Sequence, residues 1–114
     1  MSSGRLPAKL EVAGLLRRIS AQGGFATILR RGDPESGALI LIVTSRGRHS
    51  AVLERVLTAS GAYGWQVVGP GDSASSAEVA DFLAKRARFD ADSWAIELDI
   101  AEPERFIAET TAVG

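Results

Sequence analysis

The sequence predicts a single α+β domain, with a mainly antiparallel sheet of five strands and two main helices. Three observations predict this fold. The chain has 114 residues, close to the commonest size of one domain. Hydrophobic residues make up 46% and charged residues 24%, which is typical of globular proteins. Apolar residues recur at helical spacing in two segments and at strand spacing or in short runs elsewhere. We therefore expect residues 1–114 to form one globular domain.

The first expected element is a helix over residues 7–22. Pro7 suits the first turn, because its missing N–H would have no partner there. Gly23-Gly24 ends the helix, since glycine accepts the left-handed conformation found at helix ends. Apolar residues at helical spacing form a stripe along this helix, namely Leu10, Ala13, Leu16 and Ile19. Val12 and Leu15 lie beside this stripe.

Four strands are expected next, joined by polar or glycine-containing turns. Residues 38–44 form a continuously apolar run, which indicates a central strand buried on both faces. Residues 49–58 also fit a helix, but we favour a strand because a hairpin-like turn follows at residues 60–64. Connections of hairpin length predict an antiparallel meander of these strands, which span residues 25–31, 38–44, 49–58 and 65–68.

A second helix is expected after a capping box, in which Ser75 and Glu78 stand three residues apart. Residues 94–100 then alternate apolar and other side chains and predict a half-buried, central last strand. Residues 103–109 fit a short terminal helix. The apolar stripe of the second helix consists of Val79, Phe82, Leu83 and Ala87. Because each helix has one such stripe to bury, the helices should cover at least one face of the sheet.

The composition excludes several kinds of protein. The absence of cysteine excludes disulfides, thiolate catalysis and zinc–thiolate sites, and it fits the reducing cytoplasm. The longest apolar run, residues 38–43, is far too short to span a bilayer. Charged residues interrupt the first 20 residues, which argues against a secretory signal. We expect a cytoplasmic protein with no membrane partner.

Charge is distributed unevenly along the chain. Residues 1–60 hold 9 Lys or Arg against 4 Asp or Glu, and residues 61–114 hold 4 against 10, giving +5 and −6 for the net −1. An arginine cluster could bind phosphates if its members lie together, and otherwise it is a solvated surface paired with carboxylates. The candidate binding surface comprises Arg17, Arg18, Arg30, Arg31, Arg46 and Arg48.

RNA binding is the alternative that this cluster raises. The order of the first six elements loosely resembles the double-stranded-RNA-binding module. The usual basic start of the second helix is missing, because Ser75, Ser76 and Glu78 stand there. Few aromatic rings are left for base stacking, since those expected in the core include Phe25, Trp65, Phe82 and Trp94.

Two stretches resemble a known family. The first joins Leu16-Arg17-Arg18, Gly23-Gly24-Phe25-Ala26, Leu29-Arg30-Arg31-Gly32 and Gly37-Ala38. The second runs over residues 86–94, through Phe89, Asp90, Asp92 and Trp94, and leads into Glu97. Together they resemble domain of unknown function 1491, a family of small, mostly alphaproteobacterial proteins, although Ala91 stands where that family often has proline. The resemblance implies a small cytoplasmic domain and transfers no catalytic residue.

The possible functional loop contains Asp90, Asp92 and Trp94. Two carboxylates could hold Mg²⁺ or Ca²⁺, but such sites need more ligands, and the twelve-residue calcium-loop pattern is absent. We therefore favour a structural loop and expect no metal. In this interpretation Phe89 and Trp94 anchor the loop in the core, Asp92 or Ser93 shapes the turn, and Asp90 pairs with an arginine.

No catalytic residue and no cofactor are predicted. His49 stands near Ser45 and Ser50, but the glycine-flanked serine of a nucleophile elbow is absent. The glycines at residues 23–24 and 69–71 lack the strand–loop–helix context of a phosphate loop. A non-enzymatic binding or adaptor module, with a protein partner or as a homodimer, is the first hypothesis. RNA binding through the arginine-rich face is the second, and a small enzyme using carboxylate and arginine chemistry is the third.

Overall fold

The computed structural model describes residues 6–111, so residues 1–5 and 112–114 of the expected domain lie outside it. The fold class and the order of elements are confirmed, including a strand at the ambiguous residues 49–58 and a third, terminal helix. The helices are α1 (Ala8–Ala21), α2 (Ser76–Phe89) and α3 (Pro103–Thr111). The strands are β1 (Phe25–Arg30), β2 (Leu39–Ser45), β3 (Arg48–Leu57), β4 (Tyr63–Val68) and β5 (Trp94–Asp99).

The strand order in the sheet is β1-β5-β2-β3-β4, so the predicted four-strand meander is wrong. Only β2, β3 and β4 follow one another in space as antiparallel neighbours. The last strand, β5, lies between β1 and β2, antiparallel to β1 and parallel to β2. The connection between β1 and β2 is long enough to cross one strand, a span of about 10 Å. The apolar strand β5 gains neighbours on both sides by this insertion.

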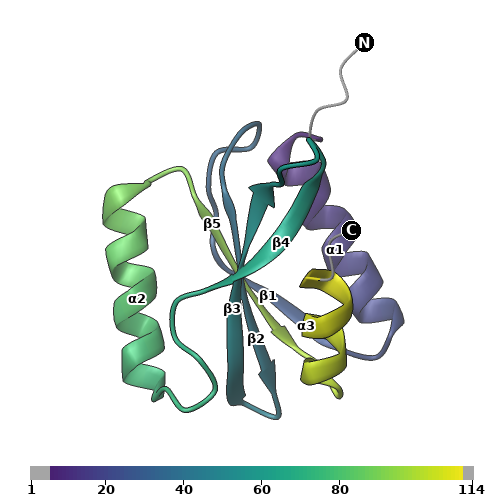
Figure 1. Cartoon of the computed structure of the whole chain (residues 1–114), viewed down its shortest axis with the longest axis vertical. Coiled ribbons are helices and arrows are strands. Elements are labelled where there is room, and N and C mark those ends of the chain that lie inside the picture. The colour runs from purple at the N-terminus through teal and green to yellow at the C-terminus, as the bar shows by residue number, and fades with distance from the viewer. Residues whose placement is uncertain (1–5, 112–114) are drawn as a thin grey trace.

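The sheet has a helix layer on each face (Figure 1). The helices α1 and α3 cover one face, and α2 covers the other. The strand β2 is buried on both faces, as its apolar run predicts. The larger core lies beneath α1 and α3 and includes Leu39, Leu41, Leu53, Trp94, Ile96 and Leu98. The smaller core lies beneath α2 and comprises Ile40, Ile42, Val52, Val79 and Ala95, with Phe82 and Leu83 packed against it.

The apolar stripe of α1 differs from the prediction. Ile19 is buried as expected, but Leu10 is exposed. Val12 and Leu15, which the prediction places beside the stripe, face the sheet instead. The buried residues of α1 are Ala8, Val12, Leu15 and Ile19. Gly23, with φ of +84°, ends the helix as predicted.

Two aromatic side chains expected in the core are exposed. Trp94 is buried and Trp65 and Phe82 are partly buried against the core, but Phe25 is 75% exposed and Phe89 is 90% exposed. Phe25 begins an edge strand, and Phe89 is the last residue of α2. Phe89 is seven positions after Phe82 and so lies on the same edge of the apolar stripe of the helix, yet it is exposed at the helix end. No helix in the region from 6 to 111 is long and apolar enough to cross a membrane.

Candidate binding surface at the end of α2

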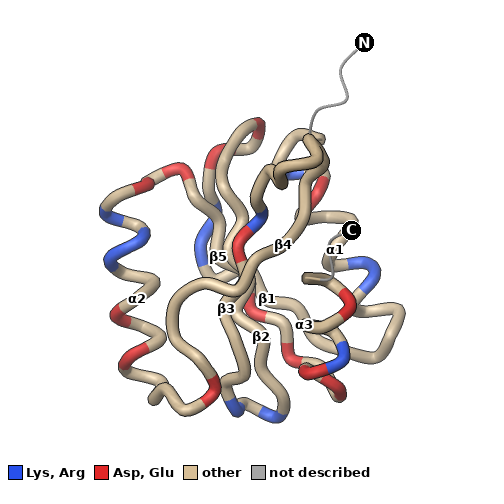
Figure 2. The backbone as a smooth tube through the Cα atoms, viewed as in Figure 1, with Lys and Arg blue, Asp and Glu red and all other residues tan. Residues whose placement is uncertain are grey.

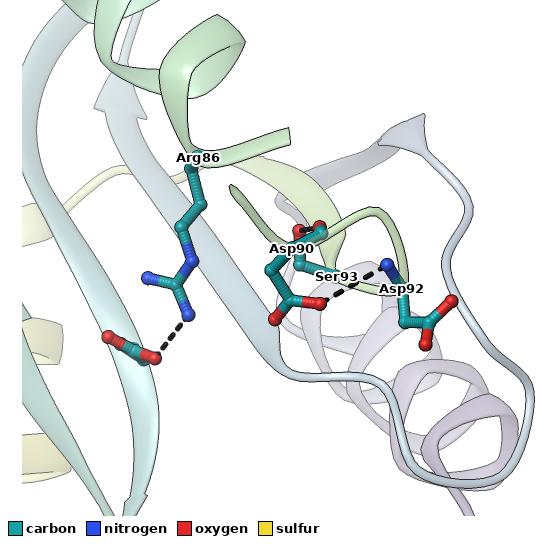
Figure 3. A network of polar contacts seen from close by, with 5 residues as sticks. Arg86, Asp90, Asp92 and Ser93 are labelled. Carbon is teal, nitrogen blue, oxygen red and sulfur yellow. Dashed lines mark hydrogen bonds and ion pairs between the residues drawn. The ribbon is translucent and has the colours of Figure 1, made fainter. Parts of the chain in front are cut away.

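The predicted functional loop is a turn that joins α2 to β5 (Figure 3). Asp90 caps the end of α2, and its Oδ1 accepts the backbone N–H of Asp92 at 3.2 Å. The Ser93 hydroxyl donates to the Asp90 carbonyl oxygen at 2.8 Å. Asp90 and Ser93 therefore shape the turn, and the Asp92 side chain is exposed to solvent. Trp94 anchors the turn in the core, whereas Phe89 does not, contrary to the prediction.

The same turn is bound to the segment that connects β1 to β2. The Trp94 indole N–H donates to the carbonyl oxygen of Asp33 at 2.8 Å. The Asp33 backbone N–H in turn donates to the Asp92 carbonyl oxygen at 2.9 Å. A Cβ atom on either Gly32 or Gly37 would lie only 2.1 Å from that Asp92 oxygen. The two stretches that carry the family resemblance thus meet here, and close backbone packing explains both glycines.

The connecting segment also caps α1. The first N–H groups of α1, from Ala8 and Lys9, donate to the carbonyl oxygens of Glu35 and Pro34 at 3.0 and 2.8 Å. The Asp33 carboxylate holds the segment in its turn by accepting the backbone N–H groups of Ser36 and Glu35. These two hydrogen bonds lower the pKa of Asp33, because they favour the charged carboxylate.

Arg86 joins the end of α2 to the sheet. Its guanidinium contacts the Glu54 carboxylate of β3 at 2.5 Å, and both side chains are partly buried (Figure 3). The hydrogen bond to Glu54 raises the pKa of Arg86, and the nearby Asp90 charge adds to the effect. Asp90 therefore lies near an arginine, although Glu54 is the ion-pair partner.

An apolar pocket of about 240 Å³ lies between the end of α2 and the sheet. Arg30 is at this pocket, and its Nη2 donates to the Ala91 carbonyl oxygen at 2.6 Å. The Arg30 Nε is buried and has no hydrogen-bond partner among residues 6–111. Phe89 lies two positions beyond Ala87, one of the pocket residues. The lining comprises Leu29, Arg30, Ile40, Leu83, Ala84, Arg86, Ala87, Ser93, Trp94 and Ala95.

The six candidate arginines lie in three separate groups (Figure 2). Arg17 and Arg18 are exposed on α1. Arg30 and Arg31 are at the end of β1, where the Arg31 guanidinium lies 5.3 Å from the centre of the Trp94 ring. Arg46 and Arg48 are exposed at the turn between β2 and β3.

Two of these groups lie at opposite ends of the sheet. Arg30 pairs with Ala95 near the start of β5. The Arg46 N–H donates to the Asp99 carboxylate at the end of β5, 2.8 Å away. Four residues of an extended strand separate Ala95 from Asp99, a distance of about 13 Å. The structure therefore does not place the six arginines on one continuous face.

His49 is not part of a nucleophile–base pair in the structure. Its Nε2 is 3.0 Å from the Pro70 carbonyl oxygen, and its Nδ1 has no hydrogen-bond partner in the part of the chain that the structure describes. Over residues 6–111, no three His, Asp or Glu side chains come together in a way that could hold a metal ion.

Sequence reasoning missed the pocket and the exposure of Phe89. The helical pattern gives no signal for the exposure of Phe89, because Phe89 is on the same side of α2 as Phe82, which packs against the core. The pocket depends on how α2 lies across the sheet, which the sequence pattern does not specify.

Several solved structures resemble this chain, including the following three. A crystal structure of a DUF1491 family protein from Caulobacter crescentus has a TM-score of 0.75 and 25% identity, covering 84% of this chain and 89% of that one. An NMR structure of a DUF1491 family protein from the same species has a TM-score of 0.72 and 26% identity, covering 88% and 91%. The solution structure of Atu0922 from A. tumefaciens has a TM-score of 0.68 and 25% identity, covering 87% and 89%.

No curated protein matches the chain. The model of one family, described as a protein of unknown function (DUF1491), matches residues 6–108, which is most of the chain. The chain therefore belongs to the DUF1491 family of proteins of unknown function.

Proposed function

We propose that this protein is a non-enzymatic binding module of the cytoplasm, formed by residues 1–114 as one domain, which docks a segment of another protein at the end of α2. The observation that carries the proposal is Phe89, a large apolar side chain that is 90% exposed at the end of α2, the helix end that also lines the apolar pocket through Arg86 and Ala87. Burying a phenylalanine side chain contributes about 1.5–3 kcal/mol, and aromatic residues are enriched among the residues that dominate binding energy.

The surroundings of the pocket suggest the chemistry of the partner. Arg30 is a cation in a lining whose other polar residues are Arg86 and Ser93, and its Nε has no partner among residues 6–111. Arg86 is already neutralised by Glu54. A partner segment that offers an apolar side chain with a carboxylate next to it would bury the first in the pocket and pair the second with Arg30.

The test compares three tagged proteins in a pull-down from bacterial lysate, each with and without nuclease treatment. The proteins are the wild type, Phe89→Ser, and the control Leu57→Ser, which removes another exposed apolar side chain at the end of β3. We expect one discrete protein partner that the wild type and Leu57→Ser retain after nuclease treatment and that Phe89→Ser loses.

Two outcomes would contradict the proposal. Equal retention by Phe89→Ser and Leu57→Ser would mean that the end of α2 is not the docking surface. Proteins that are recovered only without nuclease treatment, and that the double variant Arg46→Gln, Arg48→Gln does not recover, would favour the RNA-binding hypothesis instead.

A further inference from the structure

The strand β1 is an edge of the sheet with little protection. Within the described chain only β5 pairs with it, so its other side presents free backbone hydrogen-bonding groups. Natural edge strands usually carry lysine, proline or inward-facing charges that prevent pairing with another chain. None of these occurs between Phe25 and Leu29, and the protective feature that β1 does carry is the bulge between Ile28 and Arg30 at its end.

The exposed side chains of β1 share one face. Phe25 and Thr27 pair with Asp99 and Glu97, which alternate with the buried core residues of β5 and so lie on the α2 face. Leu29 is on this face as well, because it lines the pocket beneath α2.

This part of the α2 face lacks a helix. The helix α2 packs on residues of β2, β3 and β5, and Phe25 and Leu29 remain 75% and 49% exposed. On the opposite face, Ala26 and Ile28 pack against the core beneath α1 and α3. The edge and the uncovered side chains above it form one continuous surface.

We propose that a second copy of this chain pairs with β1 in antiparallel orientation, with the two-fold axis at Thr27. This register places Phe25 of each copy beside Leu29 of the other on the uncovered face. Ala26 then lies opposite Ile28, and Thr27 lies opposite its own copy. Side chains that are directly opposite in an antiparallel ladder lie on the same face, so the register joins apolar to apolar residues on both faces.

Charge and symmetry favour this occupant. Arg30, the only charged residue of β1, falls opposite Gly24, so no like charges meet. The pairing of β1 with β1 is closed by two-fold symmetry, whereas pairing of β1 with the other edge, β4, would continue into an open filament. The interface is one short strand with two side chains on each copy, so we expect a weak dimer that dissociates on dilution.

The on-axis position of Thr27 gives a sharp test. Sedimentation velocity of the purified full-length protein should show the mass rise from 12.0 kDa toward twice that value as concentration increases. Thr27→Lys and Thr27→Glu each place two like charges face to face, and each should weaken the dimer by about fivefold. An equimolar mixture of the two variants should recover dimer, because a lysine then faces a glutamate.

The controls separate dimerisation from folding and from the proposed function. Gln66→Lys puts the same charge on the other edge strand and should leave the dimer unchanged. Unchanged circular dichroism and thermal unfolding would show that the Thr27 variants fold, and Phe25→Ser gives a second, uncharged variant that should also weaken the dimer. A wild-type protein that is monomeric at every concentration, or a mixture of the Thr27→Lys and Thr27→Glu variants that stays monomeric, would overturn the proposal. Neither result touches Phe89, so loss of this dimer leaves the docking function to be judged by its own test.

Discussion

The substitution Gly37→Ala tests whether the two family stretches are held by backbone packing. An ideal Cβ at Gly37 would lie 2.1 Å from the Asp92 carbonyl oxygen, whereas ordinary contact begins at 3.4 Å. The obstacle is backbone, so rotation of a side chain cannot relieve it. Moving Asp92 away would stretch the hydrogen bond from the Asp33 N–H, which is 2.9 Å long. Overpacking costs about 1–3 kcal/mol and a lost hydrogen bond about 1 kcal/mol, so we expect a loss of about 2–4 kcal/mol in the free energy of unfolding.

Urea denaturation followed by circular dichroism measures this loss, which should also lower Tm by on the order of 10 °C. The matched control is Gly71→Ala, because a Cβ there meets nothing within 4 Å. Its unfolding free energy should stay within about 0.5 kcal/mol of wild type. If Gly37→Ala proves as stable as Gly71→Ala, the close packing of these two backbone segments does not limit stability, and the physical explanation of the family glycines fails.

Three further predictions concern α2 and the segment that caps α1. Ser75→Ala removes the side-chain acceptor of the capping box and should lower the unfolding free energy by about 1 kcal/mol, whereas Ser76→Ala, one position later, should change it little in the same urea assay. A double-mutant cycle with Glu54→Gln and Arg86→Gln should give a coupling free energy of about 1 kcal/mol, and additive single effects would show that the ion pair contributes nothing. The pKa of Asp33 in an NMR titration should lie below the ordinary value of about 3.9. The charged Asp33 carboxylate therefore stabilises the fold above that pH, and this stabilisation is lost as the pH falls through the lowered pKa. Asp33→Asn should remove this acid dependence, and an ordinary pKa for Asp33 would contradict the hydrogen-bonded turn.

The elements were predictable because their signals are local. Each signal involves residues that are close together in the sequence. Examples are the capping box at Ser75, the glycine after α1 and the apolar run of β2. The strand order was not predictable from such signals, because the apolar pattern of β5 shows that it is buried but not which strands flank it. Hairpin-length connections correctly joined β2, β3 and β4 and wrongly added β1.

The candidate site was predictable only in part. Trp94 was correctly placed in the core, and Asp90 in the turn, because burial and turn formation follow from residue type. Phe25 and Phe89 were misplaced by the same reasoning, since large apolar residues are expected inside. Their exposure depends on an edge strand and on the end of a helix, and those positions are set by the whole fold.

The insertion of β5 into the sheet has a consequence for how the protein folds. The ladders pair Phe25 with Asp99 and Leu39 with Trp94, so the partners are 74 and 55 positions apart in a chain of 114 residues. Such long loops must close before the contacts form, which slows folding relative to a protein of local contacts. During synthesis the hairpins of β2, β3 and β4 can form as they emerge, but β1 has no strand to pair with until β5 follows α2. A nascent chain therefore exposes the apolar β1 on both edges for longest, and this strand is where we expect a chaperone to bind and premature association to begin.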